Sequence, residues 1–271
     1  MRTIAHISDL HFGTEDNQIA SGLLKDIEEK NPSLVVVSGD LTQRARAGQF
    51  RAAREYLDKI NFPKIIVPGN HDIALFDIFR RFLFPLTRYK KYITEDLTPF
   101  YKDDEIAILG INTARSFTWK NGRISIDQMK VMKDRFCPIK MPLIEVLVIH
   151  HQFIPSPTEN VSLVGRATEA LEIIDECGVD LVLAGHLHEG FTGDTQTYHP
   201  SRRSIIIAQA GTAISNRRRG DPNSYNFITL DHKHILIEVR LWNGSVFERS
   251  EEVSYKHDEK KWIRENRTLL N

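Results

Sequence analysis

Residues that commonly bind metal ions recur in five short clusters along the first 190 residues. The clusters are DLH with Asp9 and His11, GD with Asp40, GNHD with Asn70, His71 and Asp72, HH with His150 and His151, and GHLH with His186 and His188. Neutral imidazole and carboxylate groups suit first-row metals such as zinc, manganese and iron. The set offers more ligands than one four-coordinate ion takes. Two ions sharing a bridging aspartate fit better, and such pairs, roughly 3.5–4 Å apart, stabilise the oxygens of a phosphoryl displacement.

Each cluster lies at the end of an apolar run that predicts a strand, or directly after it. The runs cover residues 3–8, 34–40, 64–72, 143–151 and 179–188. Helical spacing begins at Ser21 and again over residues 48–60, so the order β-α-β-α-β predicts a parallel sheet with crossover helices. In open α/β sheets, ligands bind at the carboxyl ends of the strands. We therefore expect the five clusters to meet at one edge, where glycines before Asp40, Asn70 and His186 allow tight turns.

The second half repeats the alternation and then changes. Residues 105–112 predict a strand, and Ser125 with Gln128 has the spacing of a capping box that starts a helix. A later helix is closed by Gly178. The runs SIIIAQAG, SYNFITL, HILIEVRLW and SVFERSEEV predict an antiparallel meander, with a hairpin at Asn243-Gly244. Residues 256–266 are expected to form a short helix or a loose peripheral tail. No linker is evident, so residues 1–271 are expected to form one domain.

Composition restricts the class of protein. The 271 residues are 41% hydrophobic and 27% charged, and 36 basic residues balance 36 acidic ones. Zero net charge gives no global attraction to nucleic acid, and no stable nucleic-acid complex is expected. No run approaches the roughly 18 apolar residues of a membrane span, and the N-terminus lacks the pattern of a signal peptide. Cys137 and Cys177 lack metal-type spacing and are expected to be reduced, half-buried thiols. A cytoplasmic protein is the resulting expectation.

The five clusters, in this order from residue 4 to residue 188, resemble the calcineurin-like metallophosphoesterases. The resemblance implies an α/β fold in which two mixed β-sheets, flanked by helices, form a four-layer α/β/β/α sandwich. It also implies a hydrolase that acts on phosphoesters with two divalent metal ions, for which manganese, iron and zinc all suit the ligands.

The resemblance also assigns roles residue by residue. It implies that Asp9, His11 and His188 bind one metal ion, and that Asn70, His150 and His186 bind the other. Asp40 bridges the two, together with a water or hydroxide that acts as nucleophile. His71 contacts the phosphate and protonates the leaving oxygen, and Asp72 orients His71. His150 is taken as the ligand because it aligns with the single histidine of the family, which leaves His151 as a neighbour of the site.

The wording SDLH, GDLT and GNHD is most similar to the branch that contains bacterial cyclic-nucleotide phosphodiesterases. We therefore expect a phosphodiesterase that hydrolyses cyclic nucleotides or similar small phosphodiesters. The alternatives are a pyrophosphatase acting on a nucleotide-sugar or lipid A precursor, and a non-catalytic metal-binding scaffold. A nuclease ranks last because such enzymes carry extra domains. The complete ligand set with His71 favours an enzyme.

Two further segments are candidates for contact with a substrate or partner. Residues 73–93 are aromatic and basic, and they form either a helix packed on the sheet, a cap whose Arg80, Arg81 or Arg88 holds an anion, or a contact in a homodimer. Arg217, Arg218 and Arg219 form a local basic run, and Arg115 is a similar candidate. Arginine forks suit phosphate oxygens. Of the remaining histidines, His6 is expected in the core, and His199, His232, His234 and His257 are expected at the surface.

Overall fold

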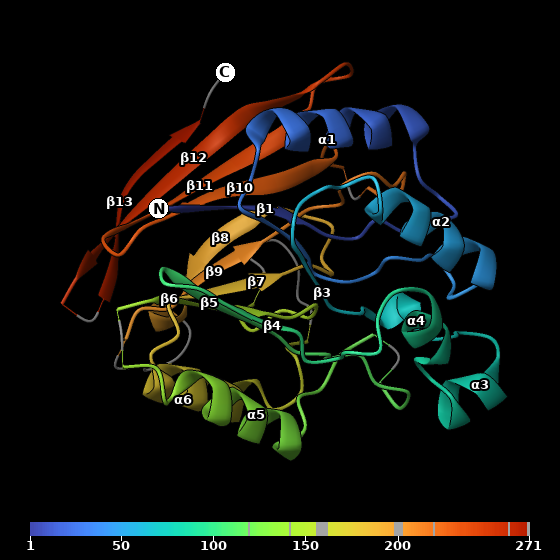
Figure 1. Cartoon of the computed structure of the whole chain (residues 1–271), viewed down its shortest axis with the longest axis horizontal. Coiled ribbons are helices and arrows are strands. Elements are labelled where there is room, and N and C mark those ends of the chain that lie inside the picture. Colours follow the sequence, from blue (N-terminus) through green and yellow to red (C-terminus); the bar gives the residue numbers. More distant parts are fainter. Residues whose placement is uncertain are drawn as a thin grey trace.

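Two mixed β-sheets are stacked face to face, and helices cover the outer face of each sheet (Figure 1). This computed structural model of the chain describes residues 1–118, 120–140, 142–155, 162–197, 203–218, 220–259 and 261–269. The four layers confirm the predicted α/β/β/α sandwich. The N-terminal strand lies inside the larger sheet, so the first metal-ligand cluster begins from the centre of the molecule.

The seven-stranded sheet has the order β13-β12-β11-β10-β1-β2-β3. Its first three strands in the chain are parallel, and the C-terminal strands add to them as an antiparallel meander. The strands are β1 (Arg2–Ile7), β2 (Leu34–Val37), β3 (Lys64–Ile66), β10 (Ser224–Leu230), β11 (His234–Trp242), β12 (Phe247–Asp258) and β13 (Lys261–Leu269). The predicted hairpin at Asn243-Gly244 joins β11 to β12.

The six-stranded sheet has the order β4-β5-β6-β7-β9-β8. Strands β5, β6, β7 and β9 are parallel, and the edge strands β4 and β8 are antiparallel to their neighbours. The strands are β4 (Phe100–Lys102), β5 (Ile106–Gly110), β6 (Ile144–Val148), β7 (Leu181–Ala184), β8 (Phe191–Asp194) and β9 (Ile206–Gln209). Every residue of β5, β6, β7 and β9 is buried, as expected for parallel strands covered on both faces.

The four longer helices pack their apolar faces against the outer faces of the sheets. The seven-stranded sheet is covered by α1 (Asn17–Lys30) and α2 (Ala47–Leu57), and the six-stranded sheet by α5 (Ile126–Phe136) and α6 (Ala167–Cys177). Ser125 caps α5 with Gln128 in a capping box, and Gly178 ends α6 in the left-handed conformation, as predicted. Short segments complete the set: η1 (Asn70–Asp72), α3 (Ile78–Leu83), α4 (Thr87–Tyr92) and η2 (Thr195–Thr197).

Three apolar layers hold these elements together. Side chains between the two sheets, such as Val36 and Val146, form the central layer. The second layer lies under α1 and α2 and includes Leu23 and Phe50, and the third lies under α5 and α6. Because every strand that precedes a metal-ligand cluster contributes to the central layer, this packing fixes where the strands end.

Two expectations for the C-terminal region are wrong. Strand β9 was expected in the meander, but it lies in the other sheet, parallel to β7. Residues 256–266 form neither a helix nor a loose tail, because β12 runs to Asp258 and β13 pairs with it. Trp262 anchors β13, since its side chain is buried and its indole N–H donates to the carboxylate of Asp180 at 3.0 Å.

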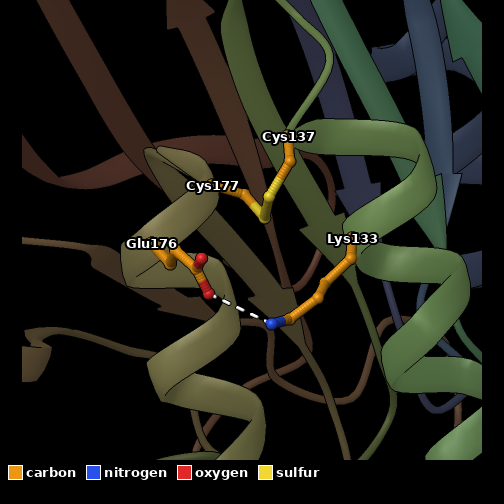
Figure 2. The surroundings of a disulfide bond; sticks show 4 residues. All are labelled: Lys133, Cys137, Glu176 and Cys177. Carbon is orange, nitrogen blue, oxygen red and sulfur yellow. Dashed lines mark hydrogen bonds and ion pairs between the residues drawn. A yellow bond between two sulfur atoms is a disulfide. The ribbon is translucent and has the colours of Figure 1, made fainter.

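The two cysteines are joined, contrary to the expectation that both are reduced thiols. A disulfide links Cys137, at the end of α5, to Cys177, at the end of α6 (Figure 2). Beside it, Lys133 and Glu176 form an exposed ion pair at 3.1 Å between the same helices. The cysteines therefore give no argument for a reducing compartment. No described helix combines the length and apolarity that a bilayer crossing requires.

Residues 73–93 do not form the single helix that was considered. Helix α4 packs on α2, where the ring of Tyr92 stacks on that of Phe50 with centroids 6.3 Å apart. Tyr89 is buried, and its hydroxyl donates to the carbonyl oxygen of Ile66. Helix α3 lies at the edge of the molecule (Figure 1) and exposes most of its apolar side chains. The segment is thus anchored through α4 and open at α3.

The remaining histidines follow most expectations. His6 is buried in β1, and its Nε2 lies 2.9 Å from Ser38 Oγ, so the prediction of a core position is confirmed. His232 and His234 are exposed, as expected. His257 is only half-exposed, since its ring lies against Trp262 with centroids 4.7 Å apart. His199 lies outside the described residues.

Candidate metal centre and active site

The loops that follow the strands bring the predicted ligands to one edge of the sandwich. The loops after β1 and β2 continue side by side, since the backbone N–H of Asp9 donates to Gly39 O at 3.1 Å and that of His11 donates to Asp40 O at 2.9 Å. On the other sheet, the N–H of Gly185 donates to His150 O, which aligns the loops after β6 and β7. The expected convergence at the carboxyl ends of the strands is observed.

The first group of ligands comprises Asp9, His11, Asp40 and His188. One ligand atom from each lies within 4.8 Å of the others, and all four side chains are buried. His11 Nε2 is 3.6 Å from Asp9 Oδ1 and 3.6 Å from Asp40 Oδ2, and His188 Nε2 is 3.4 Å from Asp9 Oδ1. The two Nε2 atoms of His11 and His188 face each other at 3.1 Å. Nitrogen and oxygen atoms therefore converge on one point.

The second group lies around His150. Its Nε2 is 3.2 Å from Asn70 Oδ1 and 3.4 Å from Asp40 Oδ1. A ligand atom from each of His150, His151 and His186 also lies within 4.8 Å of the others. The two groups meet at Asp40, whose Oδ2 points to the first group while its Oδ1 points to the second.

Unsatisfied buried atoms show that the site fits metal ions. Asp9 Oδ1 and Asp40 Oδ2 are buried among the described residues without a hydrogen-bond partner. A buried carboxylate oxygen that lacks a partner is costly unless a cation approaches it. These two atoms lie within the first group, where two imidazole nitrogens also face each other. Imidazole and carboxylate donors suit zinc, manganese and iron.

Backbone carbonyl groups hold the imidazole rings in place. His150 Nδ1 lies 2.8 Å from Ser38 O, and His188 Nδ1 lies 2.6 Å from Arg217 O. In each case the Nδ1–H donates to the carbonyl, so the Nε2 atom is left to face the site. Contacts of this kind fix the tautomer and the orientation of metal-binding histidines.

His151 lies within the second group by position, although the sequence analysis set it beside the site. Its Nδ1 is 2.7 Å from the hydroxyl of Thr113, and its ring centroid is 4.7 Å from that of His186. Only His150, however, approaches both Asn70 and Asp40 closely. These contacts favour His150 as the ligand.

Asp72 does not orient His71 as expected. Its carboxylate accepts hydrogen bonds from the backbone N–H groups of Leu41, Thr42 and Gly69 at 2.9–3.1 Å, and so holds the loops after β2 and β3 together. The ring of His71 is held instead through Nδ1, which lies 2.9 Å from the carbonyl oxygen of Gln43. Gln43 was missed because a backbone carbonyl leaves no signal in the sequence.

The candidate arginines divide between the site and other places. Arg217 is at the site, since its Nη1 lies 3.1 Å from His71 Nε2. Arg218 is exposed and Arg219 lies outside the described residues. Arg115 donates to the backbone oxygen of Asn112 at 3.0 Å and to the side chain of Gln128, so it stabilises the start of α5.

The three arginines of residues 73–93 also have other partners. Arg80 forms an ion pair with Asp77 at 3.0 Å. Arg81 is buried and donates to backbone carbonyls, and Arg88 donates to Ala45 O at 2.8 Å. None of the three is among the described residues that line the cavity beside His71.

That cavity has a volume of about 280 Å³ and opens over Asn70 and His71. Its wall includes three basic side chains, Arg44, Lys120 and Arg217. The sequence analysis identified only Arg217. Arg44 directly follows the GDLTQ stretch, which is a signal that could have found it, whereas Lys120 lies in no motif. The basic wall gives the cavity a local affinity for anions in a chain of zero net charge.

Burial and mutual attraction shift the pKa values of the ligands. Burial opposes ionisation of Asp9 and Asp40, but neighbouring histidines outweigh it and hold the pKa of each carboxyl below its usual range. Burial lowers the pKa of His186 to about 3, with the charge of His150 adding to the effect. Burial also disfavours charge on His150, but Asp40 outweighs it and raises its pKa to about 9. Ionised carboxylates and neutral imidazoles are the forms that bind metal ions, so a metal ion bound at His150 would displace the proton of that ring.

Glycine is required at position 39, where the loop after β2 passes close to the ring of His150. Gly39 has φ of +101°, and a Cβ placed there would lie 2.6 Å from Nδ1 of His150. A side chain would therefore displace the His150 ring from its place next to Asp40. This explains why GD, rather than aspartate alone, ends the second strand.

The calcineurin-like phosphoesterase family matches this chain over residues 2–190. The chain belongs to this family. All the residues of the metal centre lie within the matched range. The assignment establishes this calcineurin-like phosphoesterase as a hydrolase acting on phosphoesters, with residues that can hold metal ions.

Known relatives and structures agree with that assignment. A probable cyclic nucleotide phosphodiesterase from Synechococcus sp. is 25% identical over 207 residues, which cover 70% of this chain and 74% of the relative. A 3',5'-cyclic-nucleotide phosphodiesterase from Nostoc sp. is 23% identical over 216 residues, covering 73% and 75%. The structure of PhoD superposes with a TM-score of 0.74 at 10% identity, covering 99% of this chain and 72% of PhoD. The superposition supports the fold alone.

Proposed function

We propose that this calcineurin-like phosphoesterase is a two-metal phosphodiesterase that hydrolyses cyclic nucleotides or similar small phosphodiesters. The observation that carries the proposal is the position of Asp40, whose two carboxylate oxygens face two separate groups of ligands. The choice of substrate is supported by two relatives named as cyclic nucleotide phosphodiesterases, each of which this chain matches over about three-quarters of its length.

Asp9, His11 and His188 would hold one ion, and Asn70, His150 and His186 the other, with Asp40 shared. When bound, the two ions would supply Lewis-acid charge for the phosphoryl oxygens and lower the pKa of water so that a nucleophile exists near neutral pH. The protein holds the ligands ready for this task. The rings are fixed through Nδ1, and the loops are held together through the backbone contacts described above.

His71 would act as the general acid for the leaving oxygen. It lines the open cavity, and its Nδ1 is engaged by Gln43 O, so Nε2 is the atom that faces a substrate. Arg217 donates to this Nε2 at 3.1 Å. A phosphoryl oxygen entering between the two would accept the guanidinium hydrogen bond, and Nε2, after taking up a proton from solvent, would donate that proton to the departing alcohol oxygen.

The test is hydrolysis of bis-p-nitrophenyl phosphate and of cyclic AMP by protein loaded with manganese. We expect wild-type protein to cleave both diesters, and Asp40→Asn to lose both turnover and metal content. His71→Ala should retain its metal while kcat falls by about 10²–10⁴-fold. An Arg218→Ala variant is the matched control, because Arg218 is exposed. Metal-loaded protein that cleaves neither diester would reject the proposal and leave the pyrophosphatase and scaffold alternatives.

A further inference from the structure

Exposed apolar side chains are concentrated on one small region of the surface. Among the described residues, seven of the twelve large apolar side chains that are exposed lie there, with Phe76 and Phe79 each 77% exposed and Phe117 85% exposed. We call this region the aromatic patch; it consists of Phe76, Ile78, Phe79, Phe82, Leu83, Phe84 and Phe117. Single exposed apolar residues are common, but a contiguous cluster marks an interaction site.

The aromatic patch is held in place by a buried cation. Arg81, which is 1% exposed, donates to the backbone oxygens of Ser116 at 2.8 Å, Ala74 at 3.2 Å and Thr118 at 3.4 Å. These bonds tie α3 to the loop that carries Phe117. The ring centroids of Phe82 and Phe117 lie 5.1 Å apart, which joins the two parts of the patch. Burying an arginine is costly unless its hydrogen bonds are made. Because Arg81 makes these bonds, it fixes α3 and the loop of Phe117 in the arrangement that leaves the aromatic rings exposed.

The patch adjoins the cavity of about 280 Å³ beside His71, which we call the catalytic cavity. Ile73 lines both that cavity and a second cavity of about 380 Å³, whose wall includes Leu83 and Phe84 of the patch. The guanidinium of Arg44, which also lines the cavity beside His71, lies 5.5 Å from the centroid of the Phe76 ring. Whatever covers the patch therefore also lies beside the substrate entrance.

The surroundings of the patch are basic. Residues 73–93 contain five basic residues and one acidic residue, although Arg81 is buried beneath the patch and does not contribute to its surface charge. The acidic residue, Asp77, is already paired with Arg80. Lys90 and Lys91 of α4 are exposed, and Lys120 is exposed beside the catalytic cavity. An occupant of the patch thus meets apolar side chains within a positive rim.

The basic residues around the patch favour an anionic lipid surface over a second copy of this chain as the binding partner. A two-fold contact between copies of this chain would place the basic rim of one copy against that of the other, which is unfavourable. Surfaces that lie on membranes combine phenylalanine and leucine with lysine and arginine, and each basic residue near an anionic leaflet adds to binding. We propose that the aromatic patch docks on an anionic lipid surface. The docking itself does not depend on the proposed function; only the statement that a phosphodiester is hydrolysed beside the patch does.

The test is flotation of metal-loaded full-length protein with two kinds of vesicle, phosphatidylcholine alone and phosphatidylcholine mixed with phosphatidylglycerol. Wild-type protein is expected to float with the mixed vesicles, and far less with phosphatidylcholine, and added salt should release it. The affinity of the Phe79→Ser/Phe117→Ser variant for the mixed vesicles should be at least about tenfold lower, because two exposed rings no longer enter the bilayer. Lys90→Glu/Lys91→Glu should lose the preference for phosphatidylglycerol.

Ile263→Ser is the matched control, since Ile263 is 49% exposed on β13, on the opposite side of the molecule from α3 (Figure 1). Each variant is also assayed on soluble bis-p-nitrophenyl phosphate, where unchanged turnover shows intact folding. Failure of wild-type protein on this substrate and on cyclic AMP rejects the proposed function and leaves the flotation result valid. The docking proposal is overturned by wild-type protein that ignores the mixed vesicles, by equal binding of the phenylalanine variant, or by a wild-type dimer that this variant dissociates.

Discussion

Reduction of the disulfide between Cys137 and Cys177 is expected to lower the free energy of unfolding by about 4 kcal/mol. The bond closes a loop with a sequence separation of 40 residues. The chain-entropy relation gives a loss of about 13 cal/mol/K for a loop of this size in the unfolded chain, which is about 4 kcal/mol at 25 °C. The native fold should survive reduction, because the buried side chains of Phe136 and Ile174 hold α5 and α6 on the sheet without the bond.

The measurement is guanidinium unfolding followed by tryptophan fluorescence, with and without a phosphine reductant, and with the Cys137→Ser/Cys177→Ser variant. The unfolding midpoint should fall on reduction, and the variant should match reduced wild-type protein. Lys133→Ala is the control, because it removes the neighbouring ion pair, whose side chains are 49% and 65% exposed. Exposed pairs contribute at most about 1 kcal/mol.

Two results would refute this reasoning. If thiol titration shows two free thiols but the midpoint has not moved, closure of the loop does not contribute the stability that chain entropy predicts. If mass spectrometry of protein purified without reductant shows two free thiols, the bond does not form. A variant less stable than reduced wild-type protein would instead assign part of the effect to packing of the side chains.

Three further changes have defined outcomes. Asp26→Ala should cost about 3–5 kcal/mol in urea unfolding, because it leaves the buried guanidinium of Arg240 without the two 2.7 Å bonds that it makes to Asp26. Burial, with a neighbouring carboxylate, raises the pKa of Glu145 to about 8 in the native protein. Between the usual pKa of a glutamate and about 8, the native protein therefore keeps a proton on Glu145 that the unfolded chain has already released. Stability should therefore fall as pH rises from about 5 to about 8, and Glu145→Gln should flatten that fall in denaturant midpoints. In Gly69→Ala the new Cβ would lie 2.1 Å from Asp40 Oδ1, and titration calorimetry should show metal affinity reduced by about 10–100-fold.

Most of the fold could be predicted because its strands are buried on both faces. Continuous runs such as that of β2 leave little choice but a covered strand, and Ser125 with Gln128 marks the start of α5. Strand β13 was missed because Trp262 is the only buried side chain among its described residues, so charged residues dominate its pattern. The disulfide was missed because its partners are 40 residues apart, and only the packing of α5 on α6 brings them together.

The candidate site could be predicted as a set of side chains and not as a set of backbone contacts. The order of the clusters predicted every member of the first group, and Asn70, His150 and His186 in the second. The partners that hold the rings are carbonyl oxygens, such as Gln43 O for His71, and any residue type can supply them. Asp72 illustrates the same difficulty, since its partners are backbone N–H groups that only the fold brings to it.

Backbone strain is concentrated at the site. Among the described residues, nine other than glycine have positive φ, and five of them are predicted metal ligands: Asp9, His11, Asp40, His186 and His188. Such conformations cost on the order of 1 kcal/mol or more each, and a stable fold retains them where the surroundings enforce them. Aspartate tolerates the left-handed region better than most residues, as does histidine. The spacing of Asp9 and His11 thus has two causes, since both residues supply ligand atoms and both accept the sharp turn that aims those atoms at one point.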